Sequence, residues 1–449
     1  MSIHSLASQF STPEMDEAFS PARQLRYMTR FEWALLNALE SAGIARQGVA
    51  ETMEPLLDGT FADLESIMKE SRSAGNIAIP FVRRLTSELS RRDENAASFL
   101  HFGATSQDVI DTALVLAMRD AFDLIRISMR RLEGLLAQRA REHENTILLG
   151  RTWLQAGPPV PLGLKIAGWL AALRRHSSRL AAAETRALVL QFGGAVGTLA
   201  SLGDKGPAIS KEVAKRLDLP EPELPWHAHR DNLAEVAACL GLLVGTLGKI
   251  ARDISLLMQT EIAEVFEPAG QGQGGSSTMP HKRNPVACAG ILAAATRVPG
   301  LVATMLGAMT QEHERGLGGW QAEWETLPAI FRLSAAALDF TAEVIDGLEV
   351  DRERMLANLE GTRGLVLSEA ISAALAVSIG RPRAHALLEA ACRRAVEEKR
   401  NLRDVLMEMP EVRACLDETD LHRLLDPKNY LGSARIFIDR VLKGDYASR

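Results

Sequence analysis

The feature that most constrains the fold is a long apolar stripe that begins just after Asp231. Its members recur at alternating spacings of three and four residues: Leu233, Val236, Leu240, Leu243, Leu247, Ile250, Ile254 and Leu257. This pattern meets no proline until Pro268 and predicts one long helix of the coiled-coil type. Gly241, Gly245 and Gly248 lie within it, and each glycine costs a helix up to about 1 kcal/mol relative to alanine. Their presence indicates close helix contacts that compensate.

Other long helices are expected on both sides of this stripe. Residues 112–144 carry apolar side chains on one face, and another helix begins near Pro161, a residue suited to a first turn. Residues 286–307, with a kink at Pro299, and residues 327–348 complete the set. Strand signals are scarce, because few β-branched runs alternate with polar residues. The sequence predicts an all-α fold, and stripes of this length favour association between subunits as well as within one chain.

The organisation of the chain changes along its length. At 449 residues it exceeds one ordinary core. Shorter amphipathic helices are expected before residue 112 and again after "EGTRG" at 360–364. We therefore predict three helical domains: an N-terminal domain at 1–111, a central long-helix bundle at 112–362 that includes a loop at 268–285, and a C-terminal domain at 363–449.

Composition and charge exclude several classes of protein. Hydrophobic residues make up 47% and charged residues 24%, as in soluble globular proteins, and no apolar run approaches the roughly 20 residues of a membrane span. The N-terminus shows no secretory pattern, so a cytoplasmic protein without a membrane partner is expected. A net charge of -6 with dispersed arginines argues against a nucleic-acid partner.

Cysteine and histidine spacings indicate neither a metal nor a cofactor. The four cysteines form no CxxC or other metal-type spacing and are expected to be free, buried thiols: Cys239, Cys288, Cys392 and Cys415. No spacing of histidine and carboxylate residues is typical of a metal site.

The loop "GQGQGGSSTMPHKRNP" at 270–285 combines glycines, hydroxyls and cations, as expected of an anion site. Its start spells G-x-G-x-x-G, but a heptad helix precedes it where a dinucleotide site needs a strand. A phosphate-binding P-loop is excluded because Lys282 follows the serines. A flexible linker would explain the glycines alone, but not why Ser276, Ser277, Lys282 and Asn284 follow at once.

The motif "GGSSTMPHKRNPV" resembles the signature of the fumarase/aspartase superfamily. Separate stretches resemble the same family: "HFGATSQD" at 101–108, "GRTWLQ" at 150–155, "LQFGGAVGTLA" at 190–200 and "QEHER" at 311–315. The resemblance implies an all-helical, three-domain homotetramer whose sites are shared between subunits. It also implies addition across, or elimination to form, a carbon–carbon double bond next to a carboxylate.

The resemblance implies roles for the loop residues. Ser276 would transfer the proton, while Lys282 and Asn284 would hold the carboxylate and its enediolate form, with Ser277 also in the binding set. A serine is a poor base at its ordinary pKa, so we expect loop N–H groups and nearby cations to stabilise its alkoxide. An isolated serine would be interpreted as a helix N-cap, but the Met-Pro-x-Lys-x-Asn sequence that follows Ser276 favours the catalytic role.

Further candidates carry both a functional and a structural interpretation. His101, Thr105 and Ser106 contact substrate in the family, yet they could simply cap the helix that follows. Thr152 and Gln155 are candidate substrate contacts. Arg315 is the preferred anion contact between two helices, and the role of His313 stays open. Asp108 is expected to be structural, and no chemical role is expected for six other histidines: His143, His176, His227, His229, His385 and His422.

One departure from the family pattern narrows the reaction. Fumarases, argininosuccinate lyases and adenylosuccinate lyases carry Thr-His in the second motif, where this chain has Thr152-Trp153. An amine or hydroxide leaving group needs a proton in the transition state, and a side chain that supplies one contributes about 100-fold to 10,000-fold. A carboxylate, with a pKa of about 4, needs none. Trp153 would then form an apolar wall that keeps water out of the site. The departure favours the lactone-forming members of the family, which act on a small anionic tricarboxylate.

Two alternatives remain. An adenylosuccinate or argininosuccinate type of lyase matches the loop almost as well, but Trp153 and "GLGGWQAEWETLP" argue against it. A catalytically silent helical scaffold is possible in this family, but retention of Ser276, Lys282 and Asn284 argues against silence.

Overall fold

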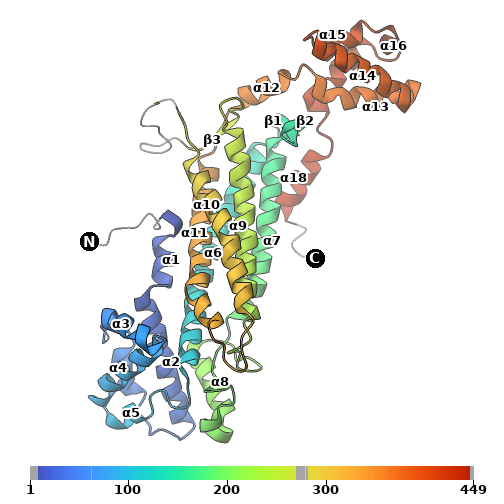
Figure 1. The fold of residues 1–449 in the computed structure, drawn as a ribbon. Helices are drawn as coiled ribbons and strands as arrows, with labels where there is room; N and C mark the ends of the chain where they lie inside the picture. The colour runs from blue at the N-terminus through green and yellow to red at the C-terminus, as the bar shows by residue number, and fades with distance from the viewer. Residues whose placement is uncertain (1–8, 62, 269–278, 280–281, 445–449) are drawn as a thin grey trace. The chain divides into compact units, whose positions relative to one another are not determined.

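The computed structural model describes residues 9–61, 63–268, 279 and 282–444. Five long helices are prominent in Figure 1: α6 (Ser106–Glu142), α7 (Leu162–Ala187), α9 (Asp231–Leu257), α10 (Val286–Ala308) and α11 (Gly319–Asp346). Strands in the described part of the chain form only two short antiparallel pairs. The expected all-α class is confirmed.

The chain forms two compact units, and their boundaries fall inside the five long helices. Unit 1 comprises Met1–Met129, His176–Leu247 and Gly290–Asp339. Unit 2 comprises Arg130–Arg175, Gly248–Ala289 and Phe340–Arg449. The division into three helical domains at residues 111 and 362 stays a prediction.

The ends of two long helices differ from those predicted. Helix α9 ends at Leu257 and does not reach Pro268. The chain turns there, because Ala263 adopts a left-handed conformation and the N–H of Glu264 returns to the carbonyl of Leu257 at 2.9 Å.

Helix α11 begins at Gly319 and not near residue 327, and Pro328 lies inside it. Its start is fixed by a cap in which the side chain of Gln321 accepts the N–H of Gly318 at 2.9 Å. Helix α6 also starts earlier than expected, at Ser106.

Short capped helices complete unit 1. They are α1 (Pro13–Ala18), α2 (Pro21–Ser41), α3 (Leu64–Ala74), α4 (Ala78–Ser90), α5 (Glu94–Ser98) and α8 (Gly206–Leu217), with 3₁₀ turns η2 (Glu51–Leu56) and η3 (Ala200–Lys205). Ser20 caps α2 by accepting the N–H of Arg23 at 3.1 Å, and Pro21 follows at the first helical position. Helices α2 and α8 pack against each other.

Unit 2 combines two strand pairs with short helices. Strands β1 (Ile147–Thr152) and β2 (Gln155–Pro161) form a hairpin, and β3 (Val265–Phe266) pairs with β4 (Glu349–Val350). The helices are α12 (Arg352–Glu360), α13 (Ser368–Ile379), α14 (Arg381–Glu397), α15 (Leu402–Met407), α16 (Pro410–Arg413), α17 (Glu418–Leu424) and α18 (Ala434–Lys443), with η4 (Leu365–Leu367) and η5 (Pro427–Asn429). Helices α13 to α17 share one apolar core.

Helices α9 and α10 are each long and apolar enough to cross a membrane by length and composition alone. The expectation that no apolar run approaches that length is therefore wrong. In the most apolar 18-residue window of α10, only 22% is buried within the chain. Its apolar character reflects side chains such as Val286 and Leu306, which are 58% and 52% exposed in the single chain.

The glycines of α9 meet different surroundings. A Cβ at Gly241 would lie 2.9 Å from Val302 of α10, so the expected close helix contact exists there. A Cβ at Gly245 would meet no atom within 4 Å. The close approach that the sequence predicted therefore holds at one of these two positions within the chain.

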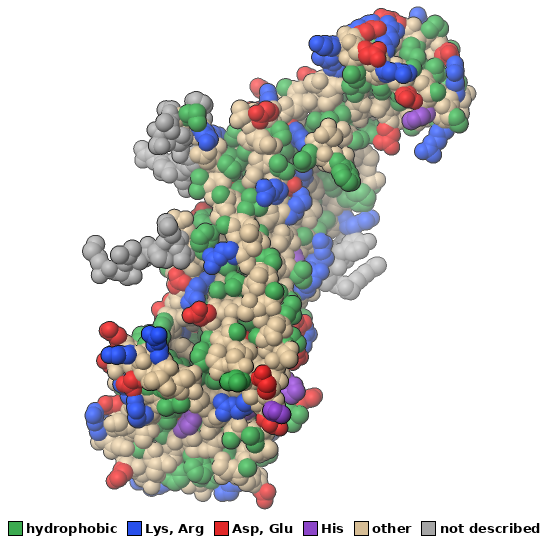
Figure 2. Space-filling model, viewed as in Figure 1, with side chains coloured by type: hydrophobic (Ala, Val, Ile, Leu, Met, Phe, Trp, Pro, Cys, Tyr) green, Lys and Arg blue, Asp and Glu red, His purple; other side chains and the backbone are tan. Residues whose placement is uncertain are grey.

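The cysteines agree in part with the expected free, buried thiols, and the surface charges are mixed as expected. All four cysteines are free, with Cys239 and Cys288 buried and Cys392 and Cys415 half-buried. On the face shown in Figure 2, lysine and arginine side chains are interspersed with aspartate and glutamate.

Candidate active site

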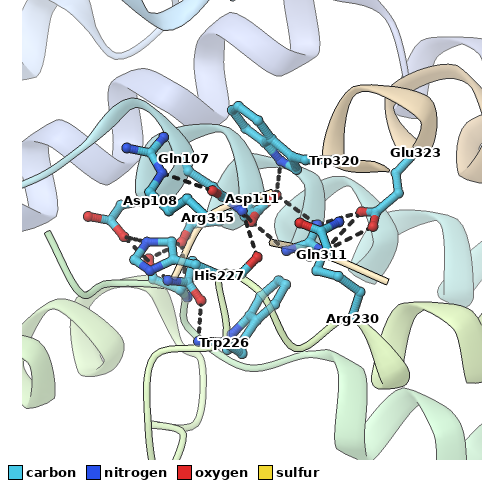
Figure 3. Close-up of polar contacts among 12 residues, drawn as sticks. Gln107, Asp108, Asp111, Trp226, His227, Arg230, Gln311, Arg315, Trp320 and Glu323 are labelled. Carbon is cyan, nitrogen blue, oxygen red and sulfur yellow. Dashed lines mark hydrogen bonds and ion pairs between the residues drawn. The ribbon is translucent and has the colours of Figure 1, made fainter. Parts of the chain in front are cut away.

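A buried carboxylate organises the N-terminal end of α6. Asp108 is 0% exposed and accepts the N–H groups of Thr105, Gly193 and Gly194 at 3.0, 3.0 and 2.9 Å. Its Oδ1 also lies 2.7 Å from Nε2 of His227 (Figure 3). Free N–H groups and the helix dipole both favour an anion at this position. These contacts support the structural role expected for Asp108.

The approach of the 193–194 backbone to Asp108 depends on glycine. Gly194 has a φ of 69°, and a Cβ there would lie 2.9 Å from the carbonyl oxygen of Gly103. A side chain at either glycine would separate the loop from the carboxylate, because a Cβ at Gly193 would lie 2.6 Å from Pro225. This explains why "LQFGGAVGTLA" carries paired glycines.

Two predicted site residues meet beside this carboxylate. Arg315, in the loop between α10 and α11, donates from Nη1 to Oγ1 of Thr105 at 2.8 Å and from Nε to Oε1 of Gln107 at 3.2 Å. Both acceptors are neutral, and no carboxylate in the described part of the chain pairs with Arg315. A guanidinium held in place by neutral partners keeps its charge available for an anion. The predicted anion contact therefore has suitable geometry.

Behind this pair lies a buried ionic network that the sequence analysis did not identify. Arg230 donates to Asp111 at 2.7 and 3.1 Å and also contacts Glu323, and these three side chains are each 1% exposed (Figure 3). Its guanidinium lies 4.8 Å from the ring centre of Trp226, and Trp320 donates to Asp111 at 3.0 Å. Burial raises the pKa of Glu323 although Arg230 opposes the rise. The network is closed to substrate and supports Gln107, which donates to Asp111 at 3.1 Å.

His101 is held by a carboxylate from a distant part of unit 1. Its backbone N–H donates to Oε2 of Glu32 at 3.0 Å, and its Nδ1 lies 2.6 Å from Oε1 of the same residue. Glu32 is fully buried on α2. Burial lowers the pKa of His101, but the Glu32 carboxylate outweighs burial and the net pKa is raised. His101 therefore tends to carry a positive charge.

In unit 2, the predicted Thr152, Trp153 and Gln155 lie at the tip of the β1–β2 hairpin. Thr152 pairs with Gln155, so Trp153 and Leu154 form a two-residue turn, with φ values of 53° and 63°. Such turns usually carry Asn-Gly, because both positions need a left-handed backbone. Trp153 is 96% exposed and Leu154 76% exposed. A strained, exposed apolar tip is typical of a functional segment. The role of Trp153 as a wall of the site stays a prediction.

A buried ion pair anchors the base of this hairpin. Arg151 donates to both carboxylate oxygens of Glu264 at 2.7 and 2.9 Å, and Glu264 is 0% exposed. Asn358 of α12 donates to the same carboxylate at 2.8 Å. The bidentate contact fixes the hairpin to the segment just before the signature loop.

The far side of the signature loop is also anchored. Arg283 donates to both oxygens of Glu349 at 2.8 and 2.9 Å, and its guanidinium lies 4.6 Å from the ring centre of Phe266. The carboxylate of Glu267 accepts the N–H groups of residues 287 and 288 at the start of α10, at 3.1 and 2.8 Å. Lys282 and Asn284 flank Arg283, and Lys282 is exposed.

The predicted residues are thus distributed between the two units. His101, Thr105, Ser106 and Arg315 belong to unit 1, while Thr152, Trp153, Gln155, Lys282 and Asn284 belong to unit 2. Ser276 and Ser277 lie outside the described residues. Within the described ranges, no group of three or more histidine, cysteine or acidic side chains could hold a metal ion.

The residues missed by the sequence analysis left partial signals. His227 and Arg230 lie in "PWHAHRDNL", and a stretch that gathers Trp, His and Arg before a helix is a plausible polar cluster. Glu32 is a charge among the apolar positions of α2, beside Met28, Phe31 and Leu35, which are all buried. A charge at an apolar position indicates a buried partner.

Comparisons with known proteins agree with the signature motifs. A family model described as "Lyase" matches residues 13–300, and one described as "Adenylosuccinate lyase C-terminus" matches residues 364–441. The chain is 50% identical over 438 residues to the 3-carboxy-cis,cis-muconate cycloisomerase of Pseudomonas aeruginosa, which covers 98% of this chain and 95% of that protein. It is 46% identical over 437 residues to the protein of the same name from Bradyrhizobium diazoefficiens, which covers 97% of each chain.

Solved structures show the same relationship. The crystal structure of 3-carboxy-cis,cis-muconate lactonizing enzyme from Pseudomonas putida matches with a TM-score of 0.93 at 49% identity and covers 97% of each chain. The family match and the full-length relatives agree with the signature loop, the glycine pair at Asp108 and the helical fold. The chain therefore belongs to the lyase family of the fumarase/aspartase superfamily.

Proposed function

We propose that this chain is a 3-carboxy-cis,cis-muconate cycloisomerase. It would close its substrate to carboxymuconolactone, a step of protocatechuate breakdown in the β-ketoadipate pathway, and it would need no cofactor. The observation that carries the proposal is Trp153, which occupies the hairpin tip next to Thr152. The names of relatives at about half identity over nearly the full chain support the same assignment.

Trp153 matters because of the group that adds to or leaves the carbon skeleton. An indole N–H does not titrate and cannot act as a general acid. An enzyme that expels an amine or hydroxide would lose a proton donor here, whereas a carboxylate is stable as an anion and needs no proton. Lactone formation by a carboxylate of the substrate fits this chemistry.

The charges of the described candidates fit a tricarboxylate. Arg315 in unit 1 and Lys282 in unit 2 are cations without a competing exposed carboxylate partner in the described ranges, and the pKa of His101 is raised by the buried Glu32 although burial opposes the rise. Fixed cations stabilise charge that develops on a carboxylate in the transition state. We propose that they hold the substrate's carboxylates, and that Thr105, Thr152, Gln155, Ser106, Ser277 and Asn284 donate hydrogen bonds.

The proposed reaction moves one proton and one electron pair. A carboxylate oxygen of the substrate attacks the far alkene carbon, and the electrons move onto the adjacent carboxylate to give an aci-carboxylate. Lys282 and neighbouring N–H groups stabilise that charge. Ser276 then delivers a proton to carbon, which collapses the enediolate and leaves the lactone.

We also propose that the cytoplasmic enzyme is a homotetramer whose sites are completed between subunits. The support is the exposed apolar surface of α10, where most of the apolar window is uncovered in one chain. Apolar helix faces of this length need a covering partner in water. Sedimentation should give four times the chain mass of 48.9 kDa; a monomer with full activity would contradict the shared sites.

The function is tested by a substrate panel. Purified protein is incubated separately with 3-carboxy-cis,cis-muconate, adenylosuccinate and argininosuccinate, and the ultraviolet absorbance is followed. Loss of the diene absorbance with the first substrate alone supports the proposal. Turnover of either succinate adduct without loss of the diene would replace the cycloisomerase by a lyase, and no turnover of any of the three would favour a silent scaffold.

A further inference from the structure

The carboxylate of Glu32 is buried, and its counter-charge comes from a single residue. It is 0% exposed, and no lysine or arginine of the described ranges pairs with it. Oε1 and Oε2 both contact His101, at 2.6 and 3.0 Å. A buried carboxylate is costly unless it is hydrogen-bonded and paired with a cation. The available cation is the imidazolium of His101.

The same contacts fix both the backbone and the ring of His101. Its φ of 60° lies in the left-handed region that residues with side chains seldom adopt. In this conformation the N–H and Nδ1 of His101 reach one carboxylate together. Glu32 therefore orients the ring as well as charging it.

The second ring nitrogen is left available. His101 is 22% exposed at its side chain while Glu32 is 0% exposed, and Nε2 has no protein partner within the described residues. Nε2 of His101 is absent from the buried side-chain atoms that lack a hydrogen-bond partner. It is therefore open to solvent. With Nδ1 donating to Glu32, a cationic ring presents Nε2–H to a ligand.

We propose that Glu32 is a positioning residue that holds His101 cationic and oriented, so that Nε2–H binds one carboxylate of the substrate. The inference rests on the proposed function, because it requires an anionic substrate. His101 lies four residues before Thr105, which Arg315 contacts at 2.8 Å at the same end of α6.

The charge of His101 follows from the groups that face it. Burial disfavours the cation, while Glu32 of α2 and Asp108 of α6 favour it, and the net pKa lies above its ordinary value. The cation is therefore present below this raised pKa and is lost as the pH rises through it. Removing the charge of Glu32 leaves burial as the larger influence, so the pKa of His101 should fall.

The coupling is tested first without turnover. Diethyl pyrocarbonate modifies only neutral imidazole, so the labelling of His101, measured by peptide mass spectrometry from pH 5 to 9, reports its pKa. In Glu32→Gln the labelling midpoint should move to lower pH. The exposed His313 serves as an internal control and should not move, and Glu40→Gln is a matched variant. Glu40 lies on the same helix but accepts the backbone N–H of Ala50 at 2.6 Å.

The role in binding is tested by kinetics on 3-carboxy-cis,cis-muconate. At pH 8, Glu32→Gln should raise KM about tenfold with a much smaller change in kcat, and lowering the pH should restore KM. His101→Gln should raise KM at all pH values, and the double variant should be no worse than His101→Gln alone. Glu32→Asp, which keeps the charge, should recover part of the pH dependence.

Each outcome separates the inference from the proposed function. Equal labelling midpoints in the wild type and Glu32→Gln would overturn the coupling. A loss of kcat that is the same at every pH and adds to that of His101→Gln would show that Glu32 is merely structural. If the wild type leaves the diene unchanged while the midpoint shifts, the proposed function fails and the Glu32–His101 coupling stands, but its assignment to substrate binding is withdrawn.

Discussion

Replacing Arg230 by methionine tests the buried network that supports the N-terminal end of α6. The side chains of Arg230, Asp111 and Glu323 are each 1% exposed, so removing the guanidinium leaves two carboxylates buried without their cation. Breaking a buried ion pair by removing one partner costs about 3–5 kcal/mol. Methionine fills much of the volume, so the loss should be electrostatic and not a cavity effect.

The expected loss depends on pH, and its sign follows from Glu323. Burial already raises the pKa of Glu323 above 4.5 although Arg230 opposes the rise. Without Arg230 that opposition disappears, so the folded-state pKa rises further. A group with a raised folded-state pKa contributes stability below its unfolded pKa and loses it as the pH rises through the folded-state value. The deficit of Arg230→Met should therefore be largest at neutral pH and shrink toward pH 4.

Urea unfolding at a fixed chain concentration, followed by circular dichroism at pH 7 and pH 4.5, measures both effects. Arg216→Met is the matched control, because Arg216 pairs with Glu212 on α8 with side chains 38% and 22% exposed. Such a surface pair contributes about 0.3–0.5 kcal/mol. If Arg230→Met cost no more than Arg216→Met, or if its deficit grew on acidification, the electrostatic account of the network would be wrong.

Three further predictions concern unit 2. Replacing Trp153-Leu154 by Asn-Gly relieves two left-handed backbone positions that cost about 1–3 kcal/mol each, so thermal unfolding should shift upward while turnover falls; a lower unfolding temperature would refute the strain. Arg283→Met removes the contacts to Glu349 and should lower kcat/KM about tenfold, because Lys282 and Asn284 lose their anchored neighbour; an unchanged kcat/KM would show that the anchor is dispensable. Burial and then Glu267 raise the pKa of Cys288, so iodoacetamide at pH 8 should label it slowly before denaturation and rapidly afterwards, whereas rapid native labelling would contradict its burial.

The long helices were predictable where local periodicity alone determines them. The stripe from Leu233 to Leu257 corresponds to α9, because a helix that buries one face repeats its apolar residues every three or four positions. The error lies beyond Leu257, where no proline marks the end and the chain leaves the helix through turns that lead to the left-handed Ala263. At α11 the opposite error occurred, because the predicted helix starts near residue 327 whereas α11 begins at Gly319 and continues through Pro328.

The hairpin was not predictable from turn chemistry. Trp153 and Leu154 are poor residues for a turn that needs two left-handed positions, so the usual Asn-Gly signal is missing. Local sequence rules fail where function or another surface selects the residue, and an exposed Trp at such a tip is a case of this kind.

The parts of the site that depend on contacts between residues far apart in sequence were also not predictable from the sequence. Glu32 and His101 are 69 residues apart, and Arg230 lies 119 residues from Asp111. Each of these residues has an ordinary local role in its own helix or loop, and only the fold brings the charges together. By contrast, Thr105 and Arg315 were each candidates from their own motifs, and the structure places them in direct contact at 2.8 Å.

The most direct test of the central claim is the product formed in D₂O. Wild-type protein is incubated with 3-carboxy-cis,cis-muconate, and the product is examined by proton NMR beside a reaction with Ser276→Ala. We predict a lactone with one carbon-bound deuterium from the wild type and none from Ser276→Ala, whose fold and oligomeric state should be unchanged. An unaltered diene with the wild type would contradict the assigned reaction, and full activity in Ser276→Ala would contradict the assigned proton donor.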